Sequence, residues 1–247
     1  MRKIARKAIA KLRHYAGHCW ATLYELRHAR DGCELIPQLT DYERLIREPS
    51  MKLKPYYLEY ISKVSPSDMA VSFRLSVLLW TLMDVLEPRL ILDLGSGFSS
   101  FLFRLHAAHA ARGAVVYSVD SDDEWLGNTR VFLERHHLNT ENLFHWPDFC
   151  GMNHLKFDLI LHDLDDMEMR GDTLPYVLSL AHERSFIILD DMHKWWYKRR
   201  AIREVDKSGY ELYSLRNYTL DDIKRFSYIA VRQQKEGVPL PALVSIS

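Results

Sequence analysis

The sequence has few cysteines and no long apolar run. Cys19, Cys33 and Cys150 are scattered along its 247 residues and odd in number. This usage argues against a disulfide framework and a zinc site, and it favours reduced thiols in the cytoplasm. No run of about 18 apolar residues occurs, which argues against a membrane-spanning helix. Internal repeats and low-complexity tracts are also missing.

A net charge of zero hides an asymmetry between the start of the chain and the rest. Residues 1–30 hold eight Lys or Arg against the single acid Glu25, and the remainder holds 25 basic and 32 acidic residues. Lys7, Lys11 and Arg13 interrupt the apolar core that a signal peptide would need. The acidic body disfavours nucleic acid as a partner.

The basic leader carries apolar residues at helical spacing, from Ile4 through Leu12 to Leu26. This pattern predicts an amphipathic helix. It would pack on the main domain or a partner subunit, as in a homo-oligomer, or lie peripherally on an anionic membrane surface. We expect a helical extension over 1–66, a main domain over 67–235 and a loose tail over 236–247.

Beyond residue 66, helical and apolar segments alternate. Ser67 is expected to cap a helix ending before Pro88, and Ser121 with Glu124 forms a candidate capping box. Strands are expected at 89–95, 114–120, 142–146, 157–163, 185–191, 211–215 and 226–231. Near-continuous apolar strands between helices predict a Rossmann-like α/β fold with a mostly parallel seven-stranded sheet.

A glycine-rich turn follows the first of these strands, in ILDLGSG. Gly95 and Gly97 would let backbone N–H groups approach a nucleotide, and Asp120 ends the second strand, where it can hold ribose hydroxyls. A dinucleotide fingerprint requires glycine or alanine where Ser100 stands. Asp93, directly before the turn, suits a ligand with a cationic end, such as the amino group of a methionine moiety.

The segment Asp93-Leu94-Gly95-Ser96-Gly97 resembles motif I of class I S-adenosylmethionine-dependent methyltransferases. Ser99, often a third glycine there, is a departure from the motif. Asp120 resembles the ribose-binding strand end, and Asp148 in WPDF resembles the adenine loop. The resemblance implies S-adenosyl-L-methionine as cofactor. The implied binding residues are Asp93, Gly95, Ser96, Gly97, Ser99, Asp120, Ser121, Asp148 and Phe149.

Carboxylates gather at the ends of two later strands. Asp163, Asp165 and Asp166 follow one strand, and Asp190 and Asp191 follow the next. Strand ends line the ligand crevice of an open α/β sheet, so these acids should converge and repel unless a cation neutralises them. Oxygen ligands favour Mg²⁺ or a similar divalent ion. The alternative is that they cap helices or lie solvated at strand ends.

The spacing of these acids resembles cation-dependent O-methyltransferases that act on sugars and natural products. The resemblance implies Asp163, Asp190 and Asp191 as metal ligands and Asp165 as the base, with His193 as a second catalytic candidate. Asp166 departs from that pattern, because histidine is common there, which leaves the base assignment open. ERS at 183–185 replaces a usual glycine pair.

The sequence therefore predicts an enzyme that methylates a hydroxyl of a small acceptor, such as a sugar or a glycan. Trp195, Trp196 and Tyr197 would either form a wall of the sugar site or bury a helix face against the sheet. Two other functions stay open. One is a non-catalytic, methyltransferase-like scaffold that uses its basic leader, and the other is an NAD-dependent Rossmann enzyme.

Overall fold

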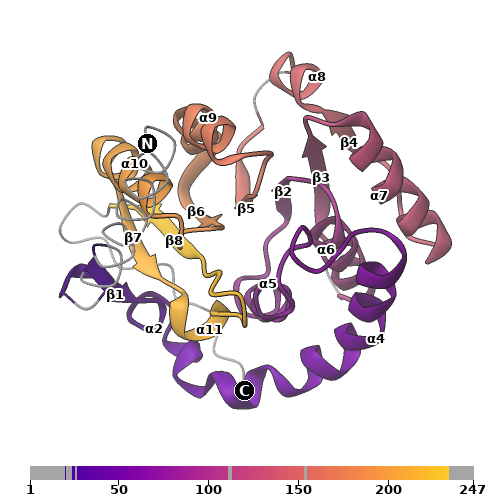
Figure 1. The fold of residues 1–247 in the computed structure, drawn as a ribbon, viewed down its shortest axis with the longest axis horizontal. Helices are drawn as coiled ribbons and strands as arrows, with labels where there is room; N and C mark the ends of the chain where they lie inside the picture. Colours follow the sequence, from indigo (N-terminus) through magenta and orange to yellow (C-terminus); the bar gives the residue numbers. More distant parts are fainter. Residues whose placement is uncertain (1–19, 21–23, 26, 111–112, 153–154, 234–247) are drawn as a thin grey trace, which may run out of the picture.

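A computed structural model describes residues 20, 24–25, 27–110, 113–152 and 155–233 (Figure 1). Its centre is an eight-stranded sheet in the order β1-β7-β8-β6-β5-β2-β3-β4. The strands are β1 Arg30–Asp31, β2 Leu90–Leu94, β3 Val115–Asp120, β4 Leu143–His145, β5 Phe157–His162, β6 Ala181–Leu189, β7 Tyr210–Ser214 and β8 Tyr228–Arg232.

The sheet is parallel except for β8, which runs antiparallel to both β6 and β7. The predicted Rossmann-like, mostly parallel sheet is confirmed. Its strand number is corrected from seven to eight, because Arg30 and Asp31 pair in parallel with Tyr213 and Ser214. This two-residue edge is too short to produce a periodic sequence pattern.

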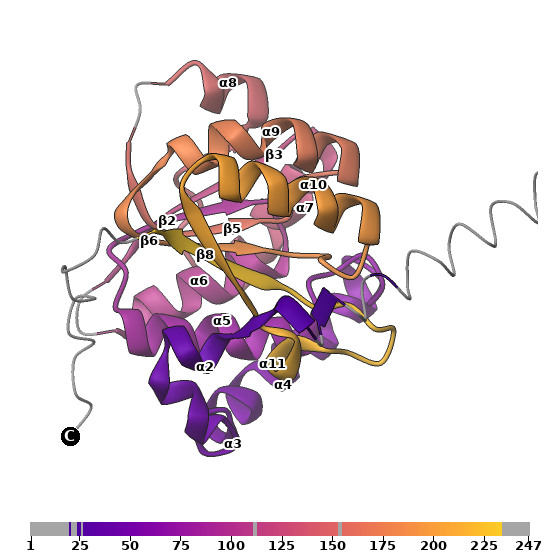
Figure 2. The same cartoon turned by 90° about the vertical axis from the view of Figure 1, so that its left-hand side faces the viewer.

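Helices cover both faces of the sheet (Figures 1 and 2). α5, Phe73–Leu86, and α6, Phe98–His109, pack on one face, while α9, Met167–Ser179, and α10, Trp195–Lys207, pack on the other. Further helices in the described part of the chain are α2 Gly32–Leu35, η1 Pro37–Asp41, α3 Tyr42–Leu45, α4 Arg47–Lys63, α7 Asp123–Arg135, α8 Trp146–Cys150 and α11 Arg216–Thr219.

Two predicted helix caps are wrong. The carboxylate of Asp122 caps α7 by accepting from the N–H groups of Glu124 and Trp125. Ser121 instead donates its hydroxyl to Asp165. α5 begins later than expected, because Ser72 has the extended backbone of an N-cap and accepts from the N–H of Leu75.

The N-terminal part joins the main domain through buried contacts. Most of the predicted leader helix lies outside the described residues, but Trp20, Tyr24 and Glu25 are helical. Glu25 accepts hydrogen bonds from Lys198, Ser214 and the hydroxyl of Tyr228. Farther along, α4 shares one apolar core with α5 and α6.

The tail over 236–247 lies outside the described residues, as does Cys19. Cys33 and Cys150 are free thiols. Among the helices that can be described, none is long and apolar enough to cross a membrane.

Candidate functional site

A cavity of about 410 Å³ opens at the carboxyl ends of β2, β3, β5 and β6. Cavities of this size hold small molecules, and this edge is where open α/β sheets bind ligands. Its lining includes Tyr60, Asp68, Met69, Gly95, Ser96, Gly97, Ser99, Asp120, Ser121, Asp122, Trp125, Asp163, Asp165, Asp166, Met167, Arg170, Asp190, Asp191 and Arg225. The glycine turn and the carboxylate cluster therefore share one cavity.

The glycine turn is shaped by close contact with the end of β5. Gly95 has φ +98°, which L side chains rarely adopt, and a Cβ there would lie 2.3 Å from the carbonyl oxygen of Asp163. A Cβ on Gly97 would lie 2.9 Å from the hydroxyl of Tyr60. A side chain is thus excluded at Gly95 by backbone, before any ligand is considered, whereas at Gly97 the Tyr60 side chain would have to shift.

Asp120 is held at the cavity by the turn. One carboxylate oxygen accepts from the backbone N–H of Ser96 at 2.7 Å and from its hydroxyl at 3.0 Å. The other oxygen accepts from the N–H of Asp122. Burial raises the pKa of Asp120, and these hydrogen bonds oppose that shift. The carboxylate is therefore fixed in place at the end of β3, where it was predicted to meet a ribose.

Asp93 lies beneath the turn and is fully buried. One of its oxygens accepts from the hydroxyls of Ser100 and Ser118, while Oδ1 has no hydrogen-bond partner. Burial raises the pKa of Asp93 to about 6, and the buried Arg104 nearby opposes that shift. Ser100 stands where a dinucleotide fingerprint has glycine or alanine, and here its hydroxyl donates a hydrogen bond to Asp93 of the motif.

Two residues predicted to contact adenine do not reach the cavity lining. Asp148 lies in the first turn of α8, and Phe149 is buried in the core with its ring near Trp146 and Phe157. Ser99 does line the cavity, and its hydroxyl donates to the carbonyl of Gly95 at 3.5 Å. The structure supports an adenine contact at neither Asp148 nor Phe149.

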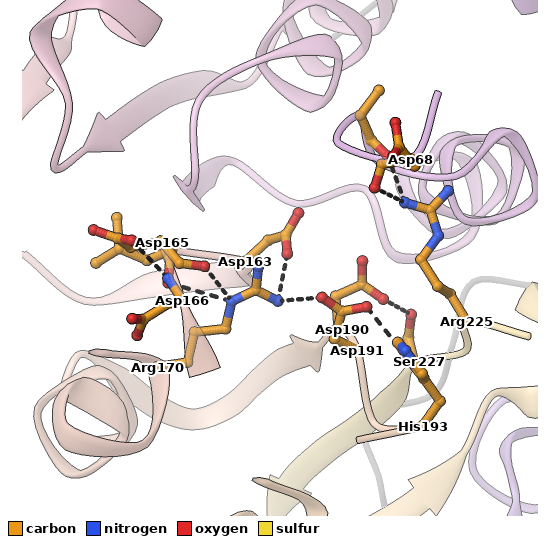
Figure 3. Close-up of polar contacts among 12 residues, drawn as sticks. Asp68, Asp163, Asp165, Asp166, Arg170, Asp190, Asp191, His193, Arg225 and Ser227 are labelled. Atoms are coloured by element: carbon orange, nitrogen blue, oxygen red, sulfur yellow. Dashed lines mark hydrogen bonds and ion pairs between the residues drawn. The ribbon is translucent and has the colours of Figure 1, made fainter. Parts of the chain in front are cut away.

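The predicted convergence of the acids at the ends of β5 and β6 is present, but an arginine lies among them (Figure 3). Nη1 of Arg170 lies 2.6 Å from Oδ1 of Asp163 and 3.1 Å from Oδ2 of Asp191. Its Nε donates to the carbonyls of Leu164 and Asp165. Only 8% of the Arg170 side chain is exposed. The cluster thus contains its own cation.

Burial and neighbouring charges shift the pKa values of this cluster. Burial raises the pKa of Asp163 well above its usual range, and Arg170 acts against that shift. Burial and the neighbouring Asp191 raise the pKa of Asp190, whose Oδ1 accepts from the hydroxyl of Ser227 at 2.6 Å. Without the guanidinium, Asp163 and Asp191 would lose the cation that they contact.

The donor set does not fit the divalent ion that the sequence resemblance implies. Within the part of the chain that can be described, no group of three His, Cys, Asp or Glu side chains is arranged to hold a metal. One carboxylate oxygen each of Asp163 and Asp191 pairs with Arg170, and one oxygen of Asp190 accepts a hydrogen bond from Ser227. An ion on the oxygens of Asp163 and Asp191 that contact Arg170 would have to displace the guanidinium.

The two predicted catalytic residues occupy different places. Asp165 lies at the cavity rim, exposed, and accepts from the hydroxyl of Ser121 at 2.6 Å. His193 does not line the cavity and lies behind Asp191, with Nδ1 3.3 Å from Oδ1 and without hydrogen-bond geometry. Burial lowers the pKa of His193 to about 4, so its ring is neutral near pH 7.

Two acids of the cluster have a strained backbone. Asp165 has φ +51° and Asp191 has φ +56°, both in the left-handed region. Such strain is typical of functional sites, where the surrounding structure holds it. Asp166, in contrast, caps α9 by accepting from the N–H groups of Glu168 and Met169. Helix capping therefore explains Asp166, as the alternative interpretation expected for these acids.

Among the cavity residues that sequence reasoning missed are Tyr60, Arg170 and Arg225. Arg225 donates to the carbonyls of 67, 68 and 70 and pairs with Asp221, so it ties the segment before α5 to the cavity mouth. Tyr60 belongs to α4, in the predicted extension. No motif marks these positions, because each reaches the cavity only through tertiary packing.

The cavity lining does not include the three aromatic residues Trp195, Trp196 and Tyr197. Tyr197 is fully buried and Trp196 is 44% exposed, so the interpretation as a buried helix face holds for Tyr197.

A second, open hollow of about 790 Å³ lies between α4, α5 and α6, with Lys52 over the ring of Trp80. It contains none of the motif residues and mixes both charges.

Comparison with solved structures connects the fold to one class. An O-methyltransferase of Bacillus cereus, solved with S-adenosylhomocysteine, matches with a TM-score of 0.51 and 16% identity over 76% of this chain and 89% of that one. A methyltransferase of Podospora anserina, solved with S-adenosylhomocysteine, matches with a TM-score of 0.56 and 12% identity over 83% of this chain and 97% of that one. An O-methyltransferase of Streptomyces achromogenes, solved with S-adenosylmethionine, matches with a TM-score of 0.54 and 12% identity over 87% of this chain and 96% of that one.

This is the fold of class I S-adenosylmethionine-dependent methyltransferases. The predicted resemblance to that class is confirmed at the level of the fold. The antiparallel β8 between β6 and β7 also separates it from the six-stranded order 3-2-1-4-5-6 of dinucleotide enzymes. No family model and no curated protein sequence matches the chain.

Proposed function

We propose that the protein is an S-adenosylmethionine-dependent methyltransferase that methylates an oxygen of a small hydroxylated acceptor. The observation that carries this proposal is the fixed carboxylate of Asp120, bonded to Ser96 of the glycine turn at one wall of the cavity. The fold has been solved with S-adenosylmethionine and S-adenosylhomocysteine in other proteins, which supports the choice of nucleotide.

The residues around the turn fit this cofactor. Asp120 offers a carboxylate to ribose hydroxyls, and the absence of a Cβ at Gly95 and Gly97 leaves backbone exposed to the cavity. The buried Oδ1 of Asp93, which has no partner, provides negative potential beneath the turn for a ligand with a cationic amino group. S-adenosylmethionine supplies an electrophilic methyl on a sulfonium, whose sulfur retains the electron pair after transfer.

The acceptor would lie beside the carboxylate-rich rim formed by Asp122, Asp165 and Asp166. Carboxylates accept hydrogen bonds from hydroxyl groups, so this rim suits a polyhydroxylated acceptor such as a sugar or glycan. Asp165 is the candidate base, because it is exposed at the rim and can accept the hydroxyl proton as the oxygen–methyl bond forms. His193 would act only through Asp191.

Calorimetry on the full chain tests the proposal directly. S-adenosylmethionine and S-adenosylhomocysteine should each bind at one site, and NAD should not. Release of S-adenosylhomocysteine in the presence of pooled sugars and phenols then reports transfer. If neither S-adenosylmethionine nor S-adenosylhomocysteine binds, the methyltransferase proposal fails and a scaffold is favoured. If NAD alone binds, an oxidoreductase is favoured.

A further inference from the structure

The guanidinium of Arg170 is fixed by the backbone around it. The backbone N–H of Arg170 donates to the carbonyl of Asp166 at 3.0 Å, within the first turn of α9, which fixes the base of the side chain. Nε donates to the carbonyls of Leu164 and Asp165 at 3.2 and 3.1 Å. These contacts come from the loop that also supplies Asp163, so the guanidinium and the Asp163 carboxylate are positioned by one segment.

Nη1 takes the place between strand ends where a shared ion would lie. It lies 2.6 Å from Asp163 at the end of β5 and 3.1 Å from Asp191 after β6 (Figure 3). These are two of the three acids expected to hold a metal. A divalent ion bound to the same oxygens would have the buried positive guanidinium as a neighbour, so the two cations exclude each other.

Nη2 is left for a ligand. It has no hydrogen-bond or ion-pair partner among the residues that the structure describes, and Arg170 lines the cavity. A guanidinium nitrogen is a donor only, so its natural partner is an oxygen, above all one that gains negative charge. In methyl transfer to a hydroxyl, the acceptor oxygen gains such charge as it loses its proton.

We propose that Arg170 is the cation of this site in place of a divalent metal. Its guanidinium holds Asp163 and Asp191 together and presents Nη2 to the acceptor oxygen, so that methyl transfer needs no metal. The pairing with the carboxylates stands on the structure alone, whereas the contact with the acceptor rests on the proposed function.

A titration with Mn²⁺ followed by electron paramagnetic resonance tests the exclusion without an acceptor. The full chain should leave Mn²⁺ free up to roughly millimolar concentration, the weak end of oxygen-ligand ion sites. Arg170→Met removes the charge and uncovers the carboxylates, so Mn²⁺ should bind about tenfold tighter or more. Adding Asp163→Asn to that variant should abolish the gained binding and locate it.

Two variants keep the result interpretable. Arg200→Ala removes a partly exposed cation that pairs with Asp172 of α9, and it should leave Mn²⁺ binding as weak as in the parent chain. Arg170→Lys keeps a positive charge in the cluster, so it should also gain no Mn²⁺ binding, even if Arg170→Met folds poorly. Thermal unfolding identifies any variant that does not fold.

Tight Mn²⁺ binding by the parent chain that is lost in Asp163→Asn would overturn the inference. S-adenosylmethionine binding is measured on the same samples in excess chelator and should be unchanged. If the cofactor binds and Mn²⁺ also binds tightly at Asp163, the arginine inference fails and the proposed function stands. If the cofactor does not bind while Mn²⁺ is excluded, the proposed function fails and the charge assignment stands.

Discussion

Gly95 and Asp163 are in backbone contact: a Cβ on Gly95 would lie 2.3 Å from the carbonyl oxygen of Asp163. The N–H of Asp163 donates to the carbonyl of Leu94 at 2.8 Å, so the chain cannot easily move away. The turn under the cofactor and the first acid of the cluster are therefore one rigid unit. Any substitution at Gly95 acts on folding before it acts on a ligand.

Gly95→Ala should destabilise the fold by about 2–4 kcal/mol, because it combines a backbone clash with an unfavourable positive φ. Gly127→Ala is the matched control. Gly127 lies within α7 with open space around its Cα, so alanine there should stabilise by about 0.5–1 kcal/mol. Urea denaturation measures both. Equal stability of the two variants would show that the turn can relax.

Asp120→Ala should weaken S-adenosylmethionine binding by about 10- to 100-fold, because it removes the carboxylate placed for the ribose. It also frees the N–H of Ser96, so part of the loss comes from the turn. Asp148→Ala is the control, because Asp148 does not line the cavity and its loss should leave affinity nearly unchanged. Calorimetry on samples with the same folded fraction measures the S-adenosylmethionine affinity of both variants. A large effect at Asp148 alone would restore the adenine contact implied by the sequence resemblance.

Parallel strand ends could be predicted from the sequence, and with them much of the site. Buried apolar strands that alternate with helices place Gly95, Asp120, Asp163 and Asp190 at one edge, and all four line the cavity. That inference needs only topology, since the carboxyl ends of parallel strands meet at the same edge. The short β1 escaped prediction, because two residues carry no periodicity.

Arg170 could not be predicted in its role. A metal-like pattern of acids looks the same whether an ion or an internal arginine neutralises it. Which one applies depends on the start of α9 at Met167 and on the left-handed Asp165, which together aim residue 170 at the cluster. Side-chain direction of this kind depends on the exact turn of a helix, and sequence patterns fix helix ends only within a few residues.

The buried carboxyl of Asp93 predicts a pH effect on stability. Its pKa is about 6 in the fold and 3.8 in the unfolded chain, so the folded state binds more protons between these values. The contribution of Asp93 to stability is therefore lowest above pH 6 and increases as the pH falls toward 3.8. Asp93→Asn cannot titrate but keeps an oxygen for Ser100 and Ser118.

The difference in unfolding free energy between the parent chain and Asp93→Asn should therefore shift by about 1–3 kcal/mol in favour of the parent as the pH falls from neutral to about 4. Urea denaturation at several pH values measures this difference. Parallel stability curves for the two proteins would mean that Asp93 titrates normally in the fold.

The pair of Lys198 and Glu25 predicts how the N-terminal part is held. The side chain of Lys198 is fully buried and bonded to Glu25, and its Nζ lies 4.9 Å from the ring centroid of Tyr24 and 4.7 Å from that of Tyr228. Lys198→Met and Glu25→Gln should each cost about 3–5 kcal/mol, because each leaves one partner buried without its counter-charge. The double variant should cost clearly less than the sum of the two.

Arg30→Ala serves as the comparison, since Arg30 also links the N-terminal part to β7 through Glu211 but is half exposed. Its loss should cost at most about 1 kcal/mol. Chemical denaturation of all four proteins, with limited proteolysis of the first 30 residues, measures the attachment. Additive effects of Lys198→Met and Glu25→Gln would show that the two side chains contribute independently. Additivity would also leave the leader's only acid without a role in docking it to the sheet.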